Sequence, residues 1–212
     1  MRTPVIVAAS IIVSLITSTD QALADRWSSP AVTDYYSPNR TFRLRVTPAM
    51  GPAGACTATL SERRFFAWYA AKWTATLSNS VAPVSALVSD SGRYVVTFDN
   101  WHQVGYGNDV VAVYDGSNGK PLLKYRLEDL LNNEELCQVK CSVSSRWWAR
   151  GRHELDESGD RLILHSVSAK AIDLKTGKIT SADTDQLGAA QHNESRGLQS
   201  LTSVPCRSCQ NR

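Results

Sequence analysis

A short pattern of strand, glycine-containing turn and strand recurs along the chain and limits the folds that it can adopt. The clearest copy covers 84–127, where apolar and β-branched residues flank turns at 89–93 and 115–119. Glycine and asparagine tolerate the positive φ that such turns require. The pattern predicts four short strands, at 85–88, 94–98, 110–114 and 122–125.

Two further copies extend this pattern over most of the chain. One covers 156–177, with Gly159 placed 67 residues after Gly92. A fainter copy covers 37–46, where Arg40 occupies the position of the glycine. Repeats of this kind are typical of arrays of small antiparallel sheets, so the sequence predicts an all-β fold of about three sheets.

These copies resemble the blades of β-propellers of the TolB-like or YVTN type, in which a Ser/Asp-Gly turn opens the second strand and Asp-x-x-x-Gly closes the third. The match is good from Tyr94 to Gly119, partial from Arg161 to Gly177 and faint from Thr41 onward. Closed propellers usually hold about four to eight blades. The resemblance therefore implies either a partial propeller completed by another chain or an open, curved stack with capped ends. It implies no activity, because propellers host binding, scaffolding and catalysis alike.

The N-terminus has the three parts of a cleavable export signal. A basic start at Arg2 precedes an apolar stretch over Val5–Ile16 and a small-x-small site over Ala22–Ala24. This stretch is too short to span a bilayer, which needs ~18 apolar residues or more. We therefore expect a signal peptide over 1–24 and a periplasmic or secreted protein, with a retained N-terminal anchor as the alternative.

The mature chain divides into a β-propeller-like domain over 25–180 and a polar tail over 181–212. Within the domain, leucines alternate with acidic residues over 126–136, which predicts one short amphipathic helix. The tail contains a C-x-x-C motif and few large apolar residues, so we expect it to be disordered.

The charge balance argues against nucleic acid as a partner. The chain carries a net charge of +3, and no run of Lys or Arg is longer than two. Phosphate binding favours a concentrated basic face, which the sequence does not predict. We also expect no membrane contact after signal cleavage. Sheets in an open stack leave strand edges unpaired, so a protein partner or self-association through these edges is expected instead.

Five cysteines in an exported chain predict disulfides, because oxidising compartments favour them. Cys137 and Cys141 form one close pair, and Cys206 and Cys209 form another. We expect the first pair to be joined to each other or to the second pair, with Cys56 as the odd thiol. The two pairs could instead bind zinc, or the C-x-x-C motif could act in thiol redox chemistry. Disulfides are favoured over both, and no metal or other cofactor is expected.

Polar and aromatic side chains are most concentrated in the loop 99–109, between two strands of the clearest repeat. Function concentrates on loops held by a rigid sheet, so this loop is the predicted ligand site. The alternative is a structural hairpin in which Asp and Asn cap turns, and this reading is favoured for the loop as a whole. The candidate ligand-binding residues are Asp99, Asn100, Trp101, His102, Tyr106 and Asp109.

The sequence assigns no catalytic residues. His153 and Glu154 follow Trp147 and Trp148 and could supply a general base, but such a stretch is more often a strand edge whose Trp residues fill space between sheets. No nucleophile-elbow, zinc-protease, phosphate-loop or EF-hand motif occurs. The sequence therefore predicts an exported binding or interaction module. The alternative is a periplasmic enzyme, or a thiol redox or zinc-binding protein that uses the two cysteine pairs.

Overall fold

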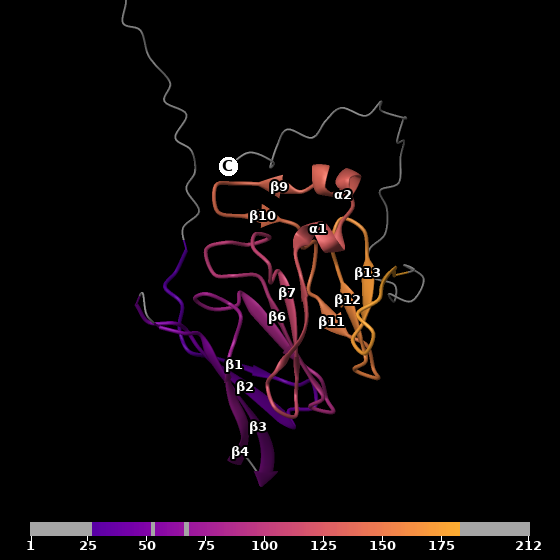
Figure 1. The fold of residues 1–212 in the computed structure, drawn as a ribbon. Coiled ribbons are helices and arrows are strands. Elements are labelled where there is room, and N and C mark those ends of the chain that lie inside the picture. The colour runs from indigo at the N-terminus through magenta and orange to yellow at the C-terminus, as the bar shows by residue number, and fades with distance from the viewer. Residues whose placement is uncertain (1–26, 52–53, 66–67, 183–212) are drawn as a thin grey trace, which may run out of the picture.

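A computed structural model describes residues 27–51, 54–65 and 68–182 of the protein (Figure 1). The predicted signal peptide and nearly all of the predicted tail lie outside the described residues. The described part contains fourteen strands and two short helices, and neighbouring strands within each sheet run antiparallel. The all-β prediction is therefore confirmed.

Three sheets of four strands follow one another along the chain, and in each the spatial order of the strands is their order in the sequence. The first sheet consists of β1 (Thr33–Tyr36), β2 (Phe42–Thr47), β3 (Thr57–Phe65) and β4 (Trp68–Thr76). The central sheet consists of β5 (Ser85–Val88), β6 (Tyr94–Phe98), β7 (Val111–Asp115) and β8 (Pro121–Tyr125). The last sheet consists of β11 (Glu154–Leu155), β12 (Arg161–Leu164), β13 (Lys170–Asp173) and β14 (Ile179–Ser181). A separate hairpin pairs β9 (Lys140–Cys141) with β10 (Arg146–Trp147).

One turn geometry precedes the second strand of each four-stranded sheet. The φ angle in this turn is positive in all three copies: 56° at Arg40, 65° at Gly92 and 70° at Gly159. The N–H of each of these residues donates a hydrogen bond to the carbonyl three positions earlier, at Ser37, Ser89 and Asp156. Arg40 thus adopts the conformation that the pattern assigns to glycine, although a Cβ makes that conformation sterically costly.

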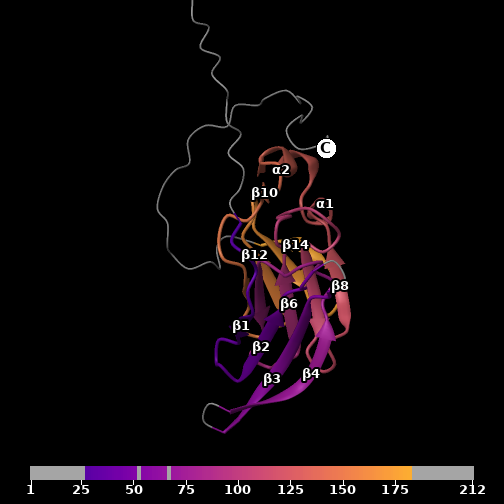
Figure 2. The ribbon, with the colours of Figure 1, turned by 90° about the vertical axis from the view of Figure 1, so that its left-hand side faces the viewer.

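The three sheets are stacked face to face, with the central sheet between the other two (Figure 1, Figure 2). All five residues of β6 are buried. Because successive side chains of a strand point to opposite faces, Val95 joins the core shared with the first sheet and Val96 joins the core shared with the last sheet. A strand buried on both faces explains why 94–98 has no polar alternation.

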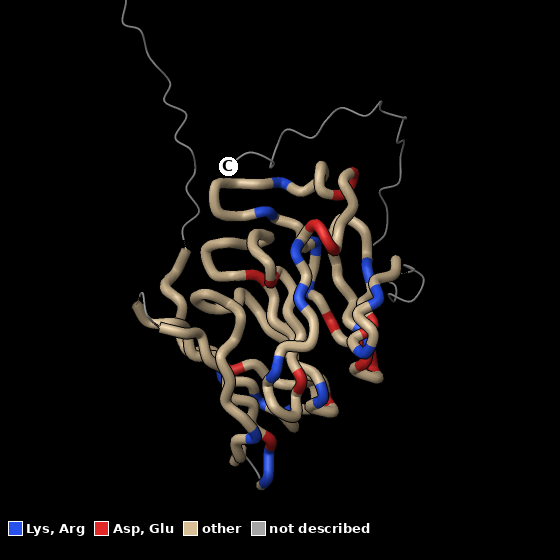
Figure 3. Tube along the Cα trace, viewed as in Figure 1, with Lys and Arg blue, Asp and Glu red and all other residues tan. Residues whose placement is uncertain are grey.

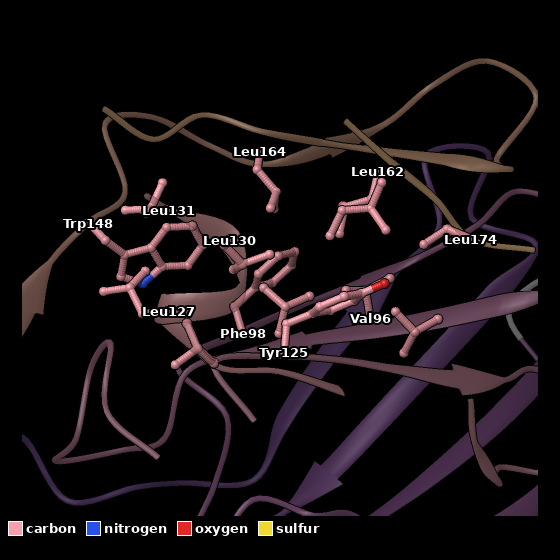
Figure 4. Packing of buried hydrophobic residues seen from close by; sticks show 14 of the residues in the cluster. Val96, Phe98, Tyr125, Leu127, Leu130, Leu131, Trp148, Leu162, Leu164 and Leu174 are labelled. Carbon is pink, nitrogen blue, oxygen red and sulfur yellow. The ribbon is translucent and has the colours of Figure 1, made fainter. Parts of the chain in front are cut away.

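Two hydrophobic cores hold the stack together. The core between the first and central sheets is built on Phe42, Leu44, Leu60, Trp73, Val88 and Tyr114. The core between the central and last sheets also receives the segment that joins them, and Figure 4 shows its members converging from all three parts. These members include Val96, Phe98, Tyr125, Leu127, Leu130, Trp148, Leu162, Leu164 and Leu174.

The turns also set the spacing between neighbouring sheets. A Cβ added at Gly92 would lie 2.4 Å from the ring of Phe42 in the first sheet, so only glycine allows this approach. On the other side, the guanidinium of Arg93 lies 2.7 Å from the Asp160 carboxylate in the matching turn of the last sheet. Each recurring turn therefore contacts its counterpart or a strand of the adjacent sheet.

Two short helices replace the single helix predicted over 126–136. They are α1 (Leu127–Leu130) and α2 (Asn133–Cys137). Leu131 between them is extended, and Asn132 caps the second helix by accepting a hydrogen bond from the Glu135 N–H at 2.9 Å. Asn is a strong N-cap former, so it starts a new helix where the leucine spacing alone predicts continuation. No helix within the described ranges is long and apolar enough to cross a membrane.

Candidate functional site

The loop 99–109 joins β6 to β7 through backbone conformations that residues with a side chain rarely adopt. Asp99 and His102 have φ of 56° and 71°, and Gly105 and Gly107 have φ of 70° and 91°. Asp99 and His102 are two of the three non-glycine residues with positive φ in the described ranges. Such strain persists only where the surroundings hold the chain in place, and it is concentrated at functional sites.

Asp99 anchors the base of this loop from inside the protein. Its Oδ1 accepts hydrogen bonds from the Gly105 N–H at 2.7 Å and from the Trp148 Nε1–H at 3.0 Å. Burial raises the pKa of the Asp99 carboxyl to about 6, although these two donors favour its charged form. The side chain is 6% exposed, so it is a structural anchor and does not face ligand.

Asn100 and Asp109 are also interior residues. The Asn100 Nδ2 donates to Asp109 Oδ1 at 2.8 Å, and the Asn100 Oδ1 accepts from the Asn79 Nδ2 at 3.2 Å. Buried polar groups need such partners, because an unsatisfied donor or acceptor destabilises the fold. Three of the six predicted ligand residues therefore hold the shape of the loop.

Tyr106 lies on the side of the loop that meets the β9–β10 hairpin. The guanidinium of Arg146 sits 5.4 Å from the centre of the Tyr106 ring. The Arg146 Nη1 also lies 2.6 Å from Glu128 Oε1. The backbone N–H of Arg146 donates a hydrogen bond to the Val104 carbonyl at 2.8 Å. These contacts fix the far end of the loop against β10.

Trp101 and His102 reach the surface, where they meet a third ring from the N-terminal segment. The ring centres of Trp27 and Trp101 are 6.2 Å apart, and those of Trp27 and His102 are 5.8 Å apart. The Trp101 Nε1–H donates to the Ser28 carbonyl at 2.9 Å. The loop is thereby joined to a segment 73 residues away in the sequence.

A groove of about 350 Å³ runs beside these rings, along the edge where the first and central sheets meet. Trp27 and Trp101 form part of its wall, and it is also lined by Ser28, Ser29, Pro30, Thr33, Tyr35, Val46, Pro83 and Val84. None of the described residues that line it is charged. Burial raises the pKa of the Tyr35 hydroxyl by disfavouring the phenolate. The neutral phenol is a hydrogen-bond donor.

His153 does not form a catalytic site with its neighbours. Its ring lies between Phe98 and Trp148, with ring centres 4.7 Å and 4.8 Å away. Its Nδ1 accepts a hydrogen bond from the His165 N–H at 3.1 Å. Burial, assisted by repulsion from His165, lowers the pKa of His153 to about 4. A neutral imidazole with both faces covered is a core residue.

Three of the five cysteines, Cys56, Cys137 and Cys141, lie in the described residues. Cys56 is a buried free thiol, and burial raises its pKa to about 11. No disulfide joins two cysteines of the described ranges, so the local Cys137–Cys141 bridge is absent there. Cys206 and Cys209 lie outside the described residues, so a bridge to the tail stays a prediction. Within the described ranges, no group of three or more His, Cys, Asp or Glu side chains is placed to hold a metal ion.

Sequence reasoning located the loop but missed Trp27 and Tyr35, which lie far from it in the chain. Only the fold brings these residues next to Trp101, and no local pattern signals the contact. No protein-family model matches this chain, and no curated protein is significantly similar to it.

Proposed function

We propose that the protein is an exported binding module that holds a small neutral ligand in the groove beside Trp27 and Trp101. The observation that carries this proposal is the convergence of two indole rings from distant segments on one uncharged groove. The strained loop that supplies Trp101 is anchored by Asp99 and Asn100, so the ring is held in a fixed position.

The chemistry of the lining indicates the class of ligand. An ionic group would lose hydration in this groove without meeting an opposite charge, which is unfavourable. Indole and proline surfaces favour flat apolar faces, and the hydroxyl groups of Ser, Thr and Tyr favour a ligand with its own polar rim. A neutral saccharide ring has both properties, and we propose it as the ligand class.

Export is part of the same proposal. Cleavage after Ala24 leaves Asp25 as the first residue and keeps Trp27, which forms part of the groove wall, in the mature chain. N-terminal sequencing of protein recovered from the exported fraction is expected to read from Asp25. Recovery of intact Met1 from the membrane fraction would contradict export and release.

Fluorescence titration with neutral and acidic oligosaccharides tests the binding site. We expect a neutral sugar to alter the tryptophan emission and Trp101→Ala to weaken its affinity about tenfold, because stacking and burial of the ring are both lost. Trp147→Ala is the matched control, since Trp147 is 50% exposed on β10 and does not line the groove. Equal affinity in both variants, or binding of acidic sugars alone, would refute the proposed site.

Association through sheet edges stays a separate prediction. The edge strand β4 carries an exposed Lys72 beside a β-bulge, and β8 begins at Pro121, features that discourage pairing with another strand. The groove is therefore the better-supported binding surface. Light scattering over a wide concentration range checks the edge prediction, and a monomer throughout would count against self-association.

A further inference from the structure

The outer face of the first sheet, which points away from the central sheet, carries charged and aromatic side chains. Phe42 and Leu44 of β2 are buried in the core shared with the central sheet, so Arg43 between them points to the outer face. The strand register pairs Arg43 with Tyr36 of β1 on one side and with Ser61 of β3 on the other. Figure 2 shows the four strands of this sheet side by side. The outer face therefore combines side chains from several strands.

Two tyrosine rings hold two arginines on this face. The guanidinium of Arg43 lies 4.8 Å from the centre of the Tyr69 ring, and that of Arg40 lies 4.7 Å from the centre of the Tyr36 ring. The two tyrosine rings are 6.1 Å apart, and the Tyr69 hydroxyl donates a hydrogen bond to the Arg40 carbonyl at 2.8 Å. Arg63 lies opposite Tyr69 in the register of β3 and β4. These five residues are called the arginine–tyrosine cluster.

The cluster carries positive charge that no neighbouring carboxylate matches. Arg40, Arg43 and Arg63 form no ion pair with a carboxylate of the described ranges. Asp34, on the same face, is already matched with Arg45 at 2.8 Å. From the start of β1 to the end of β4 the chain contains six Lys or Arg and two Asp or Glu, a net charge of +4, which leaves −1 for the remainder. Figure 3 shows Lys and Arg at the lower end of the molecule, where the first sheet lies. Such a face favours an anionic partner.

The backbone at Arg40 gives independent support for a binding role. Arg40 has a φ of 56°, at the turn position that Gly92 and Gly159 occupy in the other two sheets. A Cβ at this angle is sterically costly, and strained backbone of this kind is concentrated at functional sites. Glycine at this position would relieve the strain but would remove the guanidinium beside the Tyr36 ring. The strain is therefore explained if the guanidinium contacts a ligand.

Hydroxyl groups continue the outer face beside the cluster. The register places Thr47, Thr57 and Thr76 in one row across the sheet, and Thr59 and Thr74 in the next row. The hydroxyl oxygens of Thr59 and Thr74 are 2.9 Å apart. Hydroxyl groups donate and accept hydrogen bonds, whereas guanidinium groups bind anionic oxygens. The face therefore suits a ligand that carries both anionic groups and hydroxyl groups.

Two other kinds of anionic partner fit this surface less well. Single-stranded nucleic acid binds by stacking bases on open aromatic faces, whereas a guanidinium lies over the rings of Tyr36 and Tyr69. An extended peptide adds a strand to an open sheet edge. The cluster is centred on β2 and β3, and each of these strands is already paired on both sides. Neither stacking on bases nor strand addition is therefore favoured here.

We propose that the outer face of the first sheet binds an anionic polysaccharide. Arginine binds planar or tetrahedral anionic groups through paired hydrogen bonds. Because the tyrosine rings already position two of the guanidinium groups, less side-chain freedom is lost when the ligand binds. This surface is separate from the groove, since Tyr35 and Val46, which line the groove, lie on the opposite face of β1 and β2. Either binding site can thus be lost without the other.

Isothermal titration of the full mature chain with polygalacturonate, dextran sulfate and polyglutamate tests the proposal. We expect at least one of the two anionic polysaccharides to bind at least tenfold more tightly than polyglutamate of equal charge. Its affinity should fall at least tenfold between about 0.05 M and about 0.3 M salt, because exposed charges are then screened. Failure of both polysaccharides to bind, affinity that salt does not change, or equally tight binding of polyglutamate would overturn the proposal.

Variants of the cluster separate binding from folding. Arg40→Gly should weaken polysaccharide binding about threefold to fivefold, yet leave the melting temperature unchanged or raise it by about 2 to 4 °C, because glycine adopts positive φ freely. Arg43→Gln with Arg63→Gln should weaken binding at least tenfold. Lys124→Gln is the control, since it removes an exposed charge from β8 and should change the affinity less than twofold. Trp101→Ala should also retain this binding, which distinguishes the surface from the groove. Wild-type affinity in Arg40→Gly and in the double variant would contradict the proposed site.

Discussion

The Trp148 indole Nε1–H donates a hydrogen bond of 3.0 Å to the Asp99 carboxylate, and the same indole ring stacks on His153 with 4.8 Å between ring centres. Trp148 thus contacts two buried groups whose pKa values are shifted in opposite directions. Burial raises the pKa of Asp99 to about 6 and lowers the pKa of His153 to about 4. Their effects on stability are opposed over the same pH range.

The variant Asp99→Asn is expected to make the protein more sensitive to acid. Between about pH 4 and 6 the folded wild type holds a proton on Asp99 that the unfolded chain releases, so acidification stabilises the fold through this group. Asn removes that gain. The free energy of unfolding should therefore fall by about 2 kcal/mol more than in wild type between pH 6.5 and pH 4, as measured by urea denaturation.

The variant His153→Asn is expected to show the opposite sign. The unfolded chain takes up a proton on histidine near pH 6.5, whereas the folded chain resists it until about pH 4, so acidification destabilises the wild type through this group. Between pH 6.5 and pH 4 the His153→Asn variant should therefore lose about 3 kcal/mol less of its free energy of unfolding than the wild type loses. All other carboxylates are shared by the variants, so differences from wild type isolate the two groups. Parallel pH profiles for all three proteins would show that neither shift is real.

The variant Gly92→Ala tests the contact that spaces the first and central sheets. Gly92 and Gly51 both have positive φ, 65° and 72°, but a Cβ at Gly92 would strike Phe42 whereas a Cβ at Gly51 meets nothing within 4 Å. Gly51→Ala should cost about 1 kcal/mol of stability from backbone strain alone, and Gly92→Ala about 2 to 4 kcal/mol. Thermal melting compares them, and equal losses would mean that the close approach to Phe42 has no energetic weight.

The Cys56 thiol is expected to be unreactive in the folded protein. It is 1% exposed, and its raised pKa of about 11 leaves almost no thiolate at pH 8. Iodoacetamide should modify Cys56 at least a hundredfold more slowly in native protein than in guanidinium, with the extent followed by mass spectrometry. Rapid labelling of Cys56 under native conditions would contradict its burial.

A long-range disulfide is the remaining prediction about the cysteines. A bridge from Cys137 or Cys141 to Cys206 or Cys209 would close a loop of about 65 to 72 residues and stabilise the fold by roughly 4 kcal/mol. Reduction should then lower the melting temperature clearly. Non-reducing peptide mapping identifies the connection, and four free thiols in protein taken from the exported fraction would refute it and favour a zinc site.

The repeated turns made most of the fold predictable. A pattern of Ser or Asp followed three residues later by glycine located the central and last sheets, and it located β2 even where Arg40 stands in place of glycine. Strands β3 and β4 had no such signal, because the hairpin that joins them lacks a glycine turn. The break between α1 and α2 depends on the cap at Asn132, which competes with a continuous leucine pattern.

The site was less predictable, because its properties arise from contacts between distant segments. The loop 99–109 was identified by its polar and aromatic content. Whether each of its side chains faces outward depends on residues that sequence cannot place beside it, such as Trp148 under Asp99 and Trp27 beside Trp101. The fold buries Asp99, Asn100 and Asp109, the carboxylates and the amide that the sequence offered as ligand contacts.

Nuclear magnetic resonance of the indole N–H groups tests the proposed groove most directly. The chain has six tryptophans, and single Trp→Phe variants assign their signals. Addition of a neutral oligosaccharide is expected to shift the signals of Trp27 and Trp101 and to leave those of Trp147 and the buried Trp148 in place. Shifts confined to tryptophans outside the groove, or no shift with any neutral sugar, would contradict the account.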